Sequence, residues 1–582
     1  MNKRNKLILS IVLSIFIGLI YIYPDIRFIL ELGSKFNGIT LTATADESFY
    51  LARLNSVYEG DYRLANIGLY EHRNDLWVTP PYFEVTLGII GKTLNIPVQY
   101  LDIICSFIFP VIIFWLIYLL IYNLSESAML GIVGACSIIL DYTLFSSKIE
   151  ILKSILVDFN YSKPLWFLRP FSPQLIYIPF ILSLLLIFKF IDSHNKWKII
   201  LIALIVTSLN YLHVYLWAFI YTGLAVWSLI AIFKKDFVMF KNIMLIFFIS
   251  AVLSLPYWIN QYYVTNSPNY SFLKILSGVE HSRRLLLPKS YLIMSMIVLY
   301  LNRHKEGKIF WFILTYLAAG LVCLNQQLIT GMIVEPIHWS SYTNKTFLII
   351  AFISSLKEIR LPKTFLNDFS INFAILLRRN IFYTVICLSL FIAFIQQHNY
   401  YYNSKKYYTE LQLLSGAINW LNNHSSKEDV VLTDSIKFPS FVFVRSLLLY
   451  THNFYYLSTD AQSLISLQEI ENRILSVMRF FDYSKEEAEE VINYEKGQIF
   501  IGLSAQFSIS EGFRTIDLDK YNFELKNKWS SLLTRDPLKL LKQYKVDFIL
   551  LSKYDHLFSS IENKYANLIR VYEDSDYKIL KI

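Results

Sequence analysis

Residues 98–122, VQYLDIICSFIFPVIIFWLIYLLIY, form a long apolar run with a single acidic residue, Asp102, near its start. A helix needs about 20 apolar residues to cross the hydrocarbon core of a bilayer, and this run exceeds that length. The run therefore predicts that the chain crosses a membrane as a helix.

Similar apolar runs lie on both sides of this segment. They cover residues 7–23, 128–145, 173–191, 198–233, 242–264, 289–302, 309–324, 345–356 and 380–397. The run 198–233 is too long for one span and is interrupted by Asn210 and His213, so it is divided into two short helices. A helical span needs roughly 20 apolar residues. With that division the sequence predicts about eleven spans.

The composition of the 582-residue chain agrees with a polytopic membrane protein. Hydrophobic residues make up 55% of it and charged residues 17%, and the mean hydropathy is +0.42. The net charge is +9, but the basic residues form short clusters between apolar runs, where they set membrane orientation, so nucleic acid is not an expected partner. The four cysteines lie within or beside apolar segments and form neither a disulfide framework nor a zinc pattern.

The basic connectors predict the orientation. The chain opens with MNKRNK, and no small-residue cleavage site follows the first apolar run, so that run is expected to be a retained span beginning in the cytoplasm. The inner loops then carry the Lys and Arg clusters, as the positive-inside rule requires. The stretches 24–97, 146–172, 265–288 and 325–344 fall outside, and so does the C-terminus. We expect a multi-pass protein of the cell (plasma or inner) membrane.

The pattern changes near residue 400, where short apolar strands alternate with helices. Helices are expected at 411–422, 465–480, 485–493 and 537–544, and strands at 429–432, 498–503 and 546–552, and residues 577–582 close the chain. This alternation is typical of a small α/β domain. The sequence thus predicts a transmembrane domain over 1–398, with its first outer loop at 24–97, and an extracytoplasmic α/β domain over 399–582.

The first outer loop contains TATADESFYLARLNSVYEGDY (42–62), in which Asp46 and Glu47 are adjacent. A carboxylate just above the membrane can act as a general base toward an acceptor hydroxyl or amine, or hold a divalent cation. The alternative is an acidic pair at a helix N-terminus, capped by Thr44 and favoured by the helix dipole. The two interpretations are compatible.

The position and content of this motif resemble the GT-C superfamily of membrane glycosyltransferases. The stretch ADESFYLAR, in the outer loop after a first span, is similar to the acidic motif of that superfamily. The resemblance implies a polyprenyl-phosphate-linked sugar donor, inversion at the anomeric carbon and an active site on the outer face. It also implies that Asp46 is the catalytic acidic residue, with Glu47 beside it. The WWDYG signature of oligosaccharyltransferases does not occur in the chain, which argues against transfer to asparagine and leaves the acceptor open.

The second outer stretch offers candidates for phosphate and metal binding. Arg169, in WFLRPFSPQ, could hold the donor phosphate through a bidentate guanidinium contact, or could be an interfacial anchor. Glu150 and Asp158 could join Asp46 around a divalent cation such as Mg or Mn, or could be ordinary loop acids.

Further polar residues lie at the outer ends of apolar runs. His213 and Asp141 interrupt such runs, where polar groups usually face a cavity or a partner. Arg283 and Arg284 could contact phosphate or be solvated. The stretch LNQQLITGMIVEPIHW (324–339) is a candidate sugar- or acceptor-binding loop, with a re-entrant turn as the alternative. Its candidate binding residues are Asn325, Gln326, Glu335 and His338.

Together these features predict an inverting glycosyltransferase that moves a sugar from a polyprenyl-phosphate donor to a saccharide, lipid or protein acceptor of the cell envelope. A transporter or lipid flippase is the first alternative, although no internal repeat is visible and the polar clusters lie at one face. The second alternative is a non-catalytic envelope assembly protein that binds through its outer domain.

Overall fold

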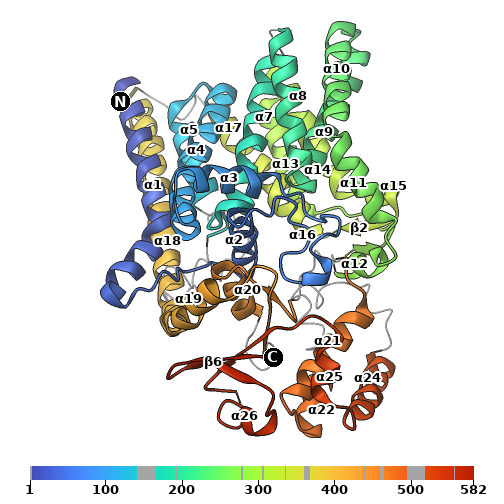
Figure 1. Ribbon diagram of the computed structural model, residues 1–582. Coiled ribbons are helices and arrows are strands. Elements are labelled where there is room, and N and C mark those ends of the chain that lie inside the picture. The colour runs from blue at the N-terminus through green and yellow to red at the C-terminus, as the bar shows by residue number, and fades with distance from the viewer. Residues whose placement is uncertain are drawn as a thin grey trace.

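The computed structural model describes residues 3–140, 165–191, 195–276, 279–304, 307–334, 336–358, 368–434, 436, 441–458, 464–493, 518–555 and 557–582. A helical bundle forms one end of the molecule and a smaller α/β part forms the other (Figure 1). Asp141, Glu150, Asp158, Glu335 and the strand expected at 498–503 lie outside the described residues.

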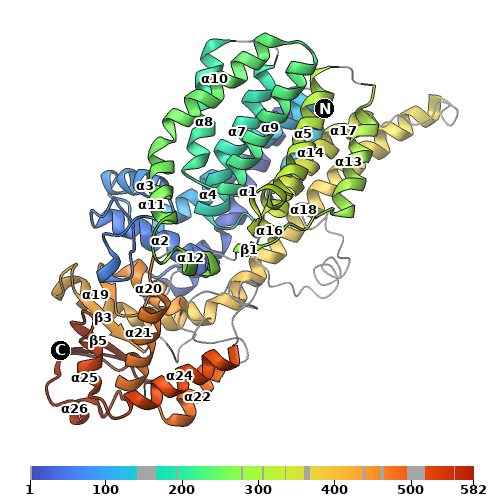
Figure 2. The same cartoon turned by 90° about the vertical axis from the view of Figure 1, so that its right-hand side faces the viewer.

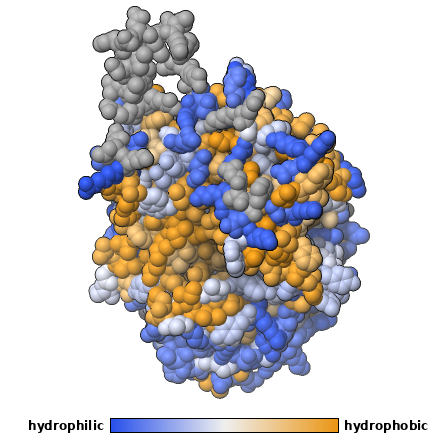
Figure 3. Space-filling view, turned by 90° about the horizontal axis from the view of Figure 1, so that it is seen from above, coloured by the Kyte–Doolittle hydropathy of each residue, from blue (hydrophilic) through white to orange (hydrophobic). Residues whose placement is uncertain are grey.

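The bundle consists of apolar helices of different lengths. They are α1 (Lys3–Leu32), α4 (Val98–Ser125), α5 (Ala128–Ile139), α7 (Ile176–Phe190), α8 (Lys196–Asn210), α9 (Val214–Phe233), α10 (Phe237–Leu253), α11 (Leu255–Thr265), α13 (Lys289–Asn302), α14 (Lys308–Leu324), α17 (Lys345–Ser355) and α18 (Asp368–Leu411). Large apolar side chains such as Phe248 and Met296 are exposed on the bundle. Viewed from the end opposite the α/β part, the molecule shows broad hydrophobic areas (Figure 3).

The described residues contain six helical segments that are long and apolar enough to cross a membrane, or seven if α10 and α11, bent by 59°, count as one span. The chain is therefore a helical multi-pass membrane protein, and eleven spans stay a prediction. The count differs because several runs form short helices: α5 and α13 are too short by themselves, and α17 covers only 11 residues.

The α/β part is built on a five-stranded sheet in the order β4-β3-β5-β7-β6. Strands β4 (Phe454–Tyr455), β3 (Val430–Thr433) and β5 (Phe548–Ser552) are parallel to one another. Strand β7 (Tyr577–Lys581) is antiparallel to both of its neighbours, β5 and β6 (Ile569–Glu573). The helices are α19 (Ser415–His424), α20 (Phe441–Tyr450), α21 (Leu467–Phe480), α22 (Lys485–Asn493), α24 (Leu518–Leu532), α25 (Pro537–Leu541) and α26 (Ile561–Lys564). Strands β3 and β5 are buried apolar segments, which suits a sheet covered by helices, whereas the edge strand β6 is largely exposed.

The boundary expected at residue 398 falls inside α18, a single helix of 44 residues. This helix runs from the bundle toward the α/β part (Figure 2). One cluster of buried apolar residues includes side chains from α4 and α9 as well as Leu447 of α20 and Phe548 of β5. The two parts therefore share a core.

The first outer loop lies between α1 and α4 and contains α2 (Ala45–Tyr58), η2 (Tyr70–His72) and α3 (Tyr82–Thr93). Inside the loop, Arg53 is 2% exposed and its Nε lies 2.7 Å from Oε1 of Glu84. The same guanidinium donates to the carbonyls of Leu64 at 3.0 Å and Thr79 at 3.1 Å. These bonds hold α2, α3 and the segment between them as one unit.

An ion-pair network joins this loop to the α/β part. Arg473 of α21 is 1% exposed, and its Nη2 lies 2.6 Å from Glu71 and 2.8 Å from Glu469. His72 contacts Asp75 at 2.7 Å and Glu469 at 3.1 Å. Burial alone would lower the pKa of His72, but these two carboxylates raise the pKa to about 9. The loop is thus docked by charged groups with little solvent screening.

Candidate active site

Local sequence fixes the start of α2. Thr44 has an extended backbone (φ −152°, ψ 163°) and its side chain accepts a hydrogen bond from the Glu47 amide at 3.4 Å. The Glu47 carboxylate in turn accepts from the Ala43 amide. This reciprocal arrangement is a variant of the capping box, in which a polar cap and an acid three residues later satisfy the free N–H groups of a first turn.

The two adjacent acids have different surroundings. The Asp46 side chain is 64% exposed, whereas Glu47 is only 4% exposed. Burial raises the pKa of Glu47 to about 7, against the opposing effects of the Ala43 amide and the Arg169 charge. Asp46 is therefore accessible to a ligand, and Glu47 is placed to support the helix start.

Arg169 lies directly against Asp46. Its Nη1 donates to Oδ2 of Asp46 at 2.7 Å, although the two residues are 123 positions apart in sequence. The guanidinium belongs to the segment just before η4 (Pro170–Leu175) and is 17% exposed. Because the carboxylate is solvent-exposed, the pair contributes at most about 1 kcal/mol, so a ligand phosphate could replace the carboxylate at low cost.

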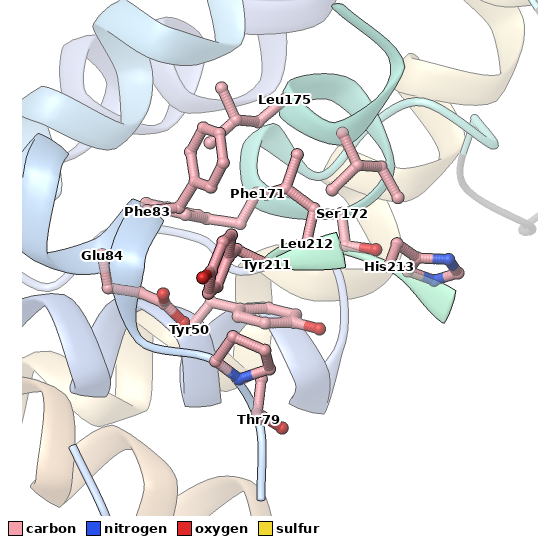
Figure 4. Close-up of a pocket in the computed structure, with 12 residues that line it drawn as sticks. Tyr50, Thr79, Phe83, Glu84, Phe171, Ser172, Leu175, Tyr211, Leu212 and His213 are labelled. Carbon is pink, nitrogen blue, oxygen red and sulfur yellow. The ribbon is translucent and has the colours of Figure 1, made fainter. Parts of the chain in front are cut away.

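Figure 4 shows a pocket whose lining includes Tyr50, four residues after Asp46, and Phe171, two residues after Arg169. Its space for water-sized molecules is about 40 Å³, and its wider outline of about 390 Å³ includes open solvent. Its walls are mainly apolar and aromatic: Tyr50, Thr79, Pro80, Phe83, Glu84, Phe171, Ser172, Leu175, Ile176, Tyr211, Leu212 and His213. Tyr50 lies one helical turn beyond Asp46 and stacks on Phe171, with ring centroids 6.1 Å apart. The pocket lining therefore includes a near neighbour in sequence of each member of the pair, whereas Asp46 and Arg169 themselves are not part of it.

The two histidines expected to bind substrate come together in an aromatic cluster. The ring of Tyr342 lies 4.5 Å from that of His213 and 5.5 Å from that of His338, and Tyr215 lies within 5.3 Å of both histidines. His213 Nδ1 is buried without a hydrogen-bond partner in the described part of the chain. Trp166, three residues before Arg169, lies 5.2 Å from Tyr342. The cluster thus adjoins the segment that carries Arg169.

The remaining candidates in the described residues lie in the segments next to a two-stranded ribbon, in which β1 (Val279–His281) pairs with β2 (Met332–Val334). Arg283 donates to the Leu328 carbonyl at 3.1 Å. Asn325 exchanges hydrogen bonds with the backbone of Leu286 at 2.7 and 2.9 Å. Gln326 donates to the Met332 carbonyl at 2.8 Å, and Gln327 to the carbonyl of Arg284 at 2.8 Å. These side chains hold the ribbon together, and their binding of substrate stays a prediction.

No group of three or more metal-binding side chains occurs among the described residues. Two of the three acids expected around a cation, Glu150 and Asp158, lie outside them. The proposed metal therefore stays a prediction.

Sequence reasoning missed the aromatic side of the site. Tyr50 lies one helical turn after Asp46, and Phe171 lies two residues after Arg169. Both could therefore have been found next to candidates that the sequence did indicate. Tyr215 and Tyr342 have the same local signal, two residues after His213 and one turn after His338, but only the packing of α9 against η5 (Trp339–Asn344) brings them together.

A scan against protein-family models finds no match, and no curated protein matches the chain. Among solved structures, the chain is similar to ArnT from Cupriavidus metallidurans in the apo state. The two chains are 8% identical, the similarity covers 99% of this chain and 97% of that one, and the TM-score is 0.46. At this identity and TM-score the likeness assigns no activity, substrate or catalytic residue to the present chain.

Proposed function

We propose that this protein is a GT-C-type membrane glycosyltransferase that moves a sugar from a polyprenyl-phosphate donor to an acceptor at the outer face of the cell membrane. The observation that carries the proposal is the 2.7 Å contact between Asp46 and Arg169. A carboxylate that can accept a proton lies next to a guanidinium that can hold a phosphate, and Tyr50 and Phe171, close to them in sequence, line a largely apolar pocket.

In the proposed reaction the acceptor attacks the anomeric carbon through its hydroxyl or amine. Asp46 takes the proton of the attacking group, and the bond between the anomeric carbon and the phosphate oxygen breaks. Polyprenyl phosphate leaves with the electron pair, and Arg169 stabilises its negative charge. Attack from the side opposite the phosphate inverts the anomeric configuration.

The pocket lining suits the apolar end of such a donor. Tyr50, Phe83 and Phe171 offer aromatic surface. The carboxylate of Glu84 is 3% exposed and is paired with Arg53. We assign the pocket to the prenyl units next to the phosphate, and the cluster around Tyr342 to the sugar.

The orientation follows from the same proposal. The loop that contains α2 lies at the end of the bundle that faces the α/β part (Figures 1 and 2). We therefore place both outside the membrane and the N-terminus in the cytoplasm, as the basic connectors indicate.

The test is transfer of a labelled sugar from a polyprenyl-phosphate donor in reconstituted membranes. Asp46→Asn should lower turnover by about 10² to 10⁴, the usual range for loss of a general base. Arg169→Gln should lower it too, because the phosphate loses its charged partner. Glu59→Gln is the matched control, since Glu59 is an exposed acid at the far end of the same helix.

Wild-type turnover by the Asp46→Asn protein would refute the catalytic assignment. If the wild type transferred no sugar from any lipid donor, the proposed function would fail, and the transporter and assembly-protein hypotheses would be favoured.

A further inference from the structure

The segment that leads into α2, residues 37–43, is held by side chains from the last third of the chain. Gln412 accepts a hydrogen bond from the Asn37 amide at 2.8 Å and donates to the Ile39 carbonyl at 2.8 Å. Tyr450 of α20 accepts from the Thr40 amide at 3.0 Å. The backbone of this segment is thus fixed from outside the first loop.

The contact nearest to Asp46 is made by Tyr408 of α18. Its hydroxyl donates to the Thr42 carbonyl at 3.1 Å and also contacts the Thr42 hydroxyl. Thr42 in turn lies 2.9 Å from the Ser48 hydroxyl, on the first turn of α2. Tyr408 is therefore connected to both sides of Asp46 through one threonine.

These contacts are shielded from water. Tyr408 is 5% exposed, Thr42 7% and Gln412 4%. A buried hydrogen-bonding group that loses its partner keeps its desolvation penalty, so each of these bonds constrains the backbone more than a surface bond would.

Asp46 itself has little packing to hold it, because most of its side chain is exposed. Its position relative to Arg169 therefore depends on where the backbone of α2 begins. A displacement of about 1 Å at a reacting group can cost a factor of about 10² in rate.

We propose that Tyr408 and Tyr450 are positioning residues, which place Asp46 by fixing the segment that enters α2. This inference rests on the proposed function, because it assigns Asp46 the role of base. It gives the α/β part and the outer end of α18 an indirect part in the reaction, through the position of Asp46.

The test uses Tyr408→Phe and Tyr450→Phe, which remove only a hydroxyl. Tyr402→Phe is the matched control, because Tyr402 is on the same helix and 63% exposed. In the transfer assay, Tyr408→Phe should lower kcat about tenfold while KM for the donor stays within twofold. Added to Asp46→Asn, it should cause no further loss, since both changes remove the same function.

Hydrogen exchange gives a readout that needs no activity. The amides of residues 40–48 should exchange about tenfold faster in Tyr408→Phe than in the wild type or the Tyr402→Phe control. Unchanged exchange in both tyrosine variants would overturn the inference whatever the transfer assay gives. A full additional loss in the double variant would also overturn it, because Tyr408 would then act independently of Asp46. An inactive wild type would count against the proposed function instead, and exchange would still decide whether the hydroxyls hold the segment.

Discussion

Replacing Glu47 by glutamine is expected to stabilise the protein above pH 7, although Glu47 stands next to the proposed catalytic residue. The side chain is 4% exposed and accepts a hydrogen bond from the Ala43 amide. Glutamine has nearly the same shape and can accept that bond with its carbonyl oxygen. What the substitution removes is a buried negative charge.

The size of the effect follows from the pKa. Burial raises the pKa of Glu47 from its ordinary value of 4.5 to about 7. Each pH unit corresponds to about 1.4 kcal/mol, so ionisation costs the folded state about 3 kcal/mol at pH 8. Because the folded pKa is the higher one, the stability contributed by the protonated group is fully present below pH 4.5 and is lost as the pH rises to 7. Loss of the favourable interaction with the α2 dipole offsets about 1 kcal/mol or less of the gain.

The assay is thermal or denaturant unfolding of the purified protein in detergent at pH 5 and pH 8. Glu47→Gln should exceed the wild type by about 2 to 3 kcal/mol at pH 8 and by about 1 kcal/mol or less at pH 5. Asp46→Asn is the control, because an exposed ion pair contributes at most about 1 kcal/mol. A destabilised Glu47→Gln protein at pH 8 would show that the structure needs this carboxylate as an anion, and would refute the reasoning.

Three further predictions concern the outer loop and its surroundings. Arg53→Met should destabilise the protein by about 3 to 5 kcal/mol in the same unfolding assay, because it leaves the buried carboxylate of Glu84 unpaired. The double variant Arg53→Met/Glu84→Leu should recover most of this loss. If the single and double variants were equally unstable, the prediction would be contradicted. Thermal stability should fall as the pH rises through about 9, because His72 then loses its proton and its attraction to Glu469. This fall should be smaller in His72→Gln. The same dependence of stability on pH in the variant and the wild type would count against the prediction. A cysteine introduced at Asn423, an exposed position of α19, should react with a membrane-impermeant reagent in intact cells. The protein should also carry Cys387→Ser, because Cys387 is itself exposed. Labelling only after cell lysis would reverse the proposed orientation.

The sequence by itself determined the features that depend on neighbouring residues. The length of its apolar runs was sufficient to predict a helical multi-pass protein, because a bilayer sets that length directly. The cap at Thr44 and the two acids after it predicted the start of α2, since capping is a local interaction. The helices at 465–480 and 485–493 and the strand at 546–552 were found for the same reason, as α21, α22 and β5.

Only the tertiary structure decided what each of these residues does. Asp46 and Glu47 are chemically similar neighbours, and packing alone makes one exposed and the other buried. Arg169 reaches Asp46 across 123 residues of chain, a distance that no periodicity encodes. Tyr408 meets Thr42 because α18 continues past the boundary expected at residue 398. Past that point, apolarity does not indicate whether the spanning helix ends or continues. Burial and long-range contact depend on what packs against a residue, which a single sequence does not reveal.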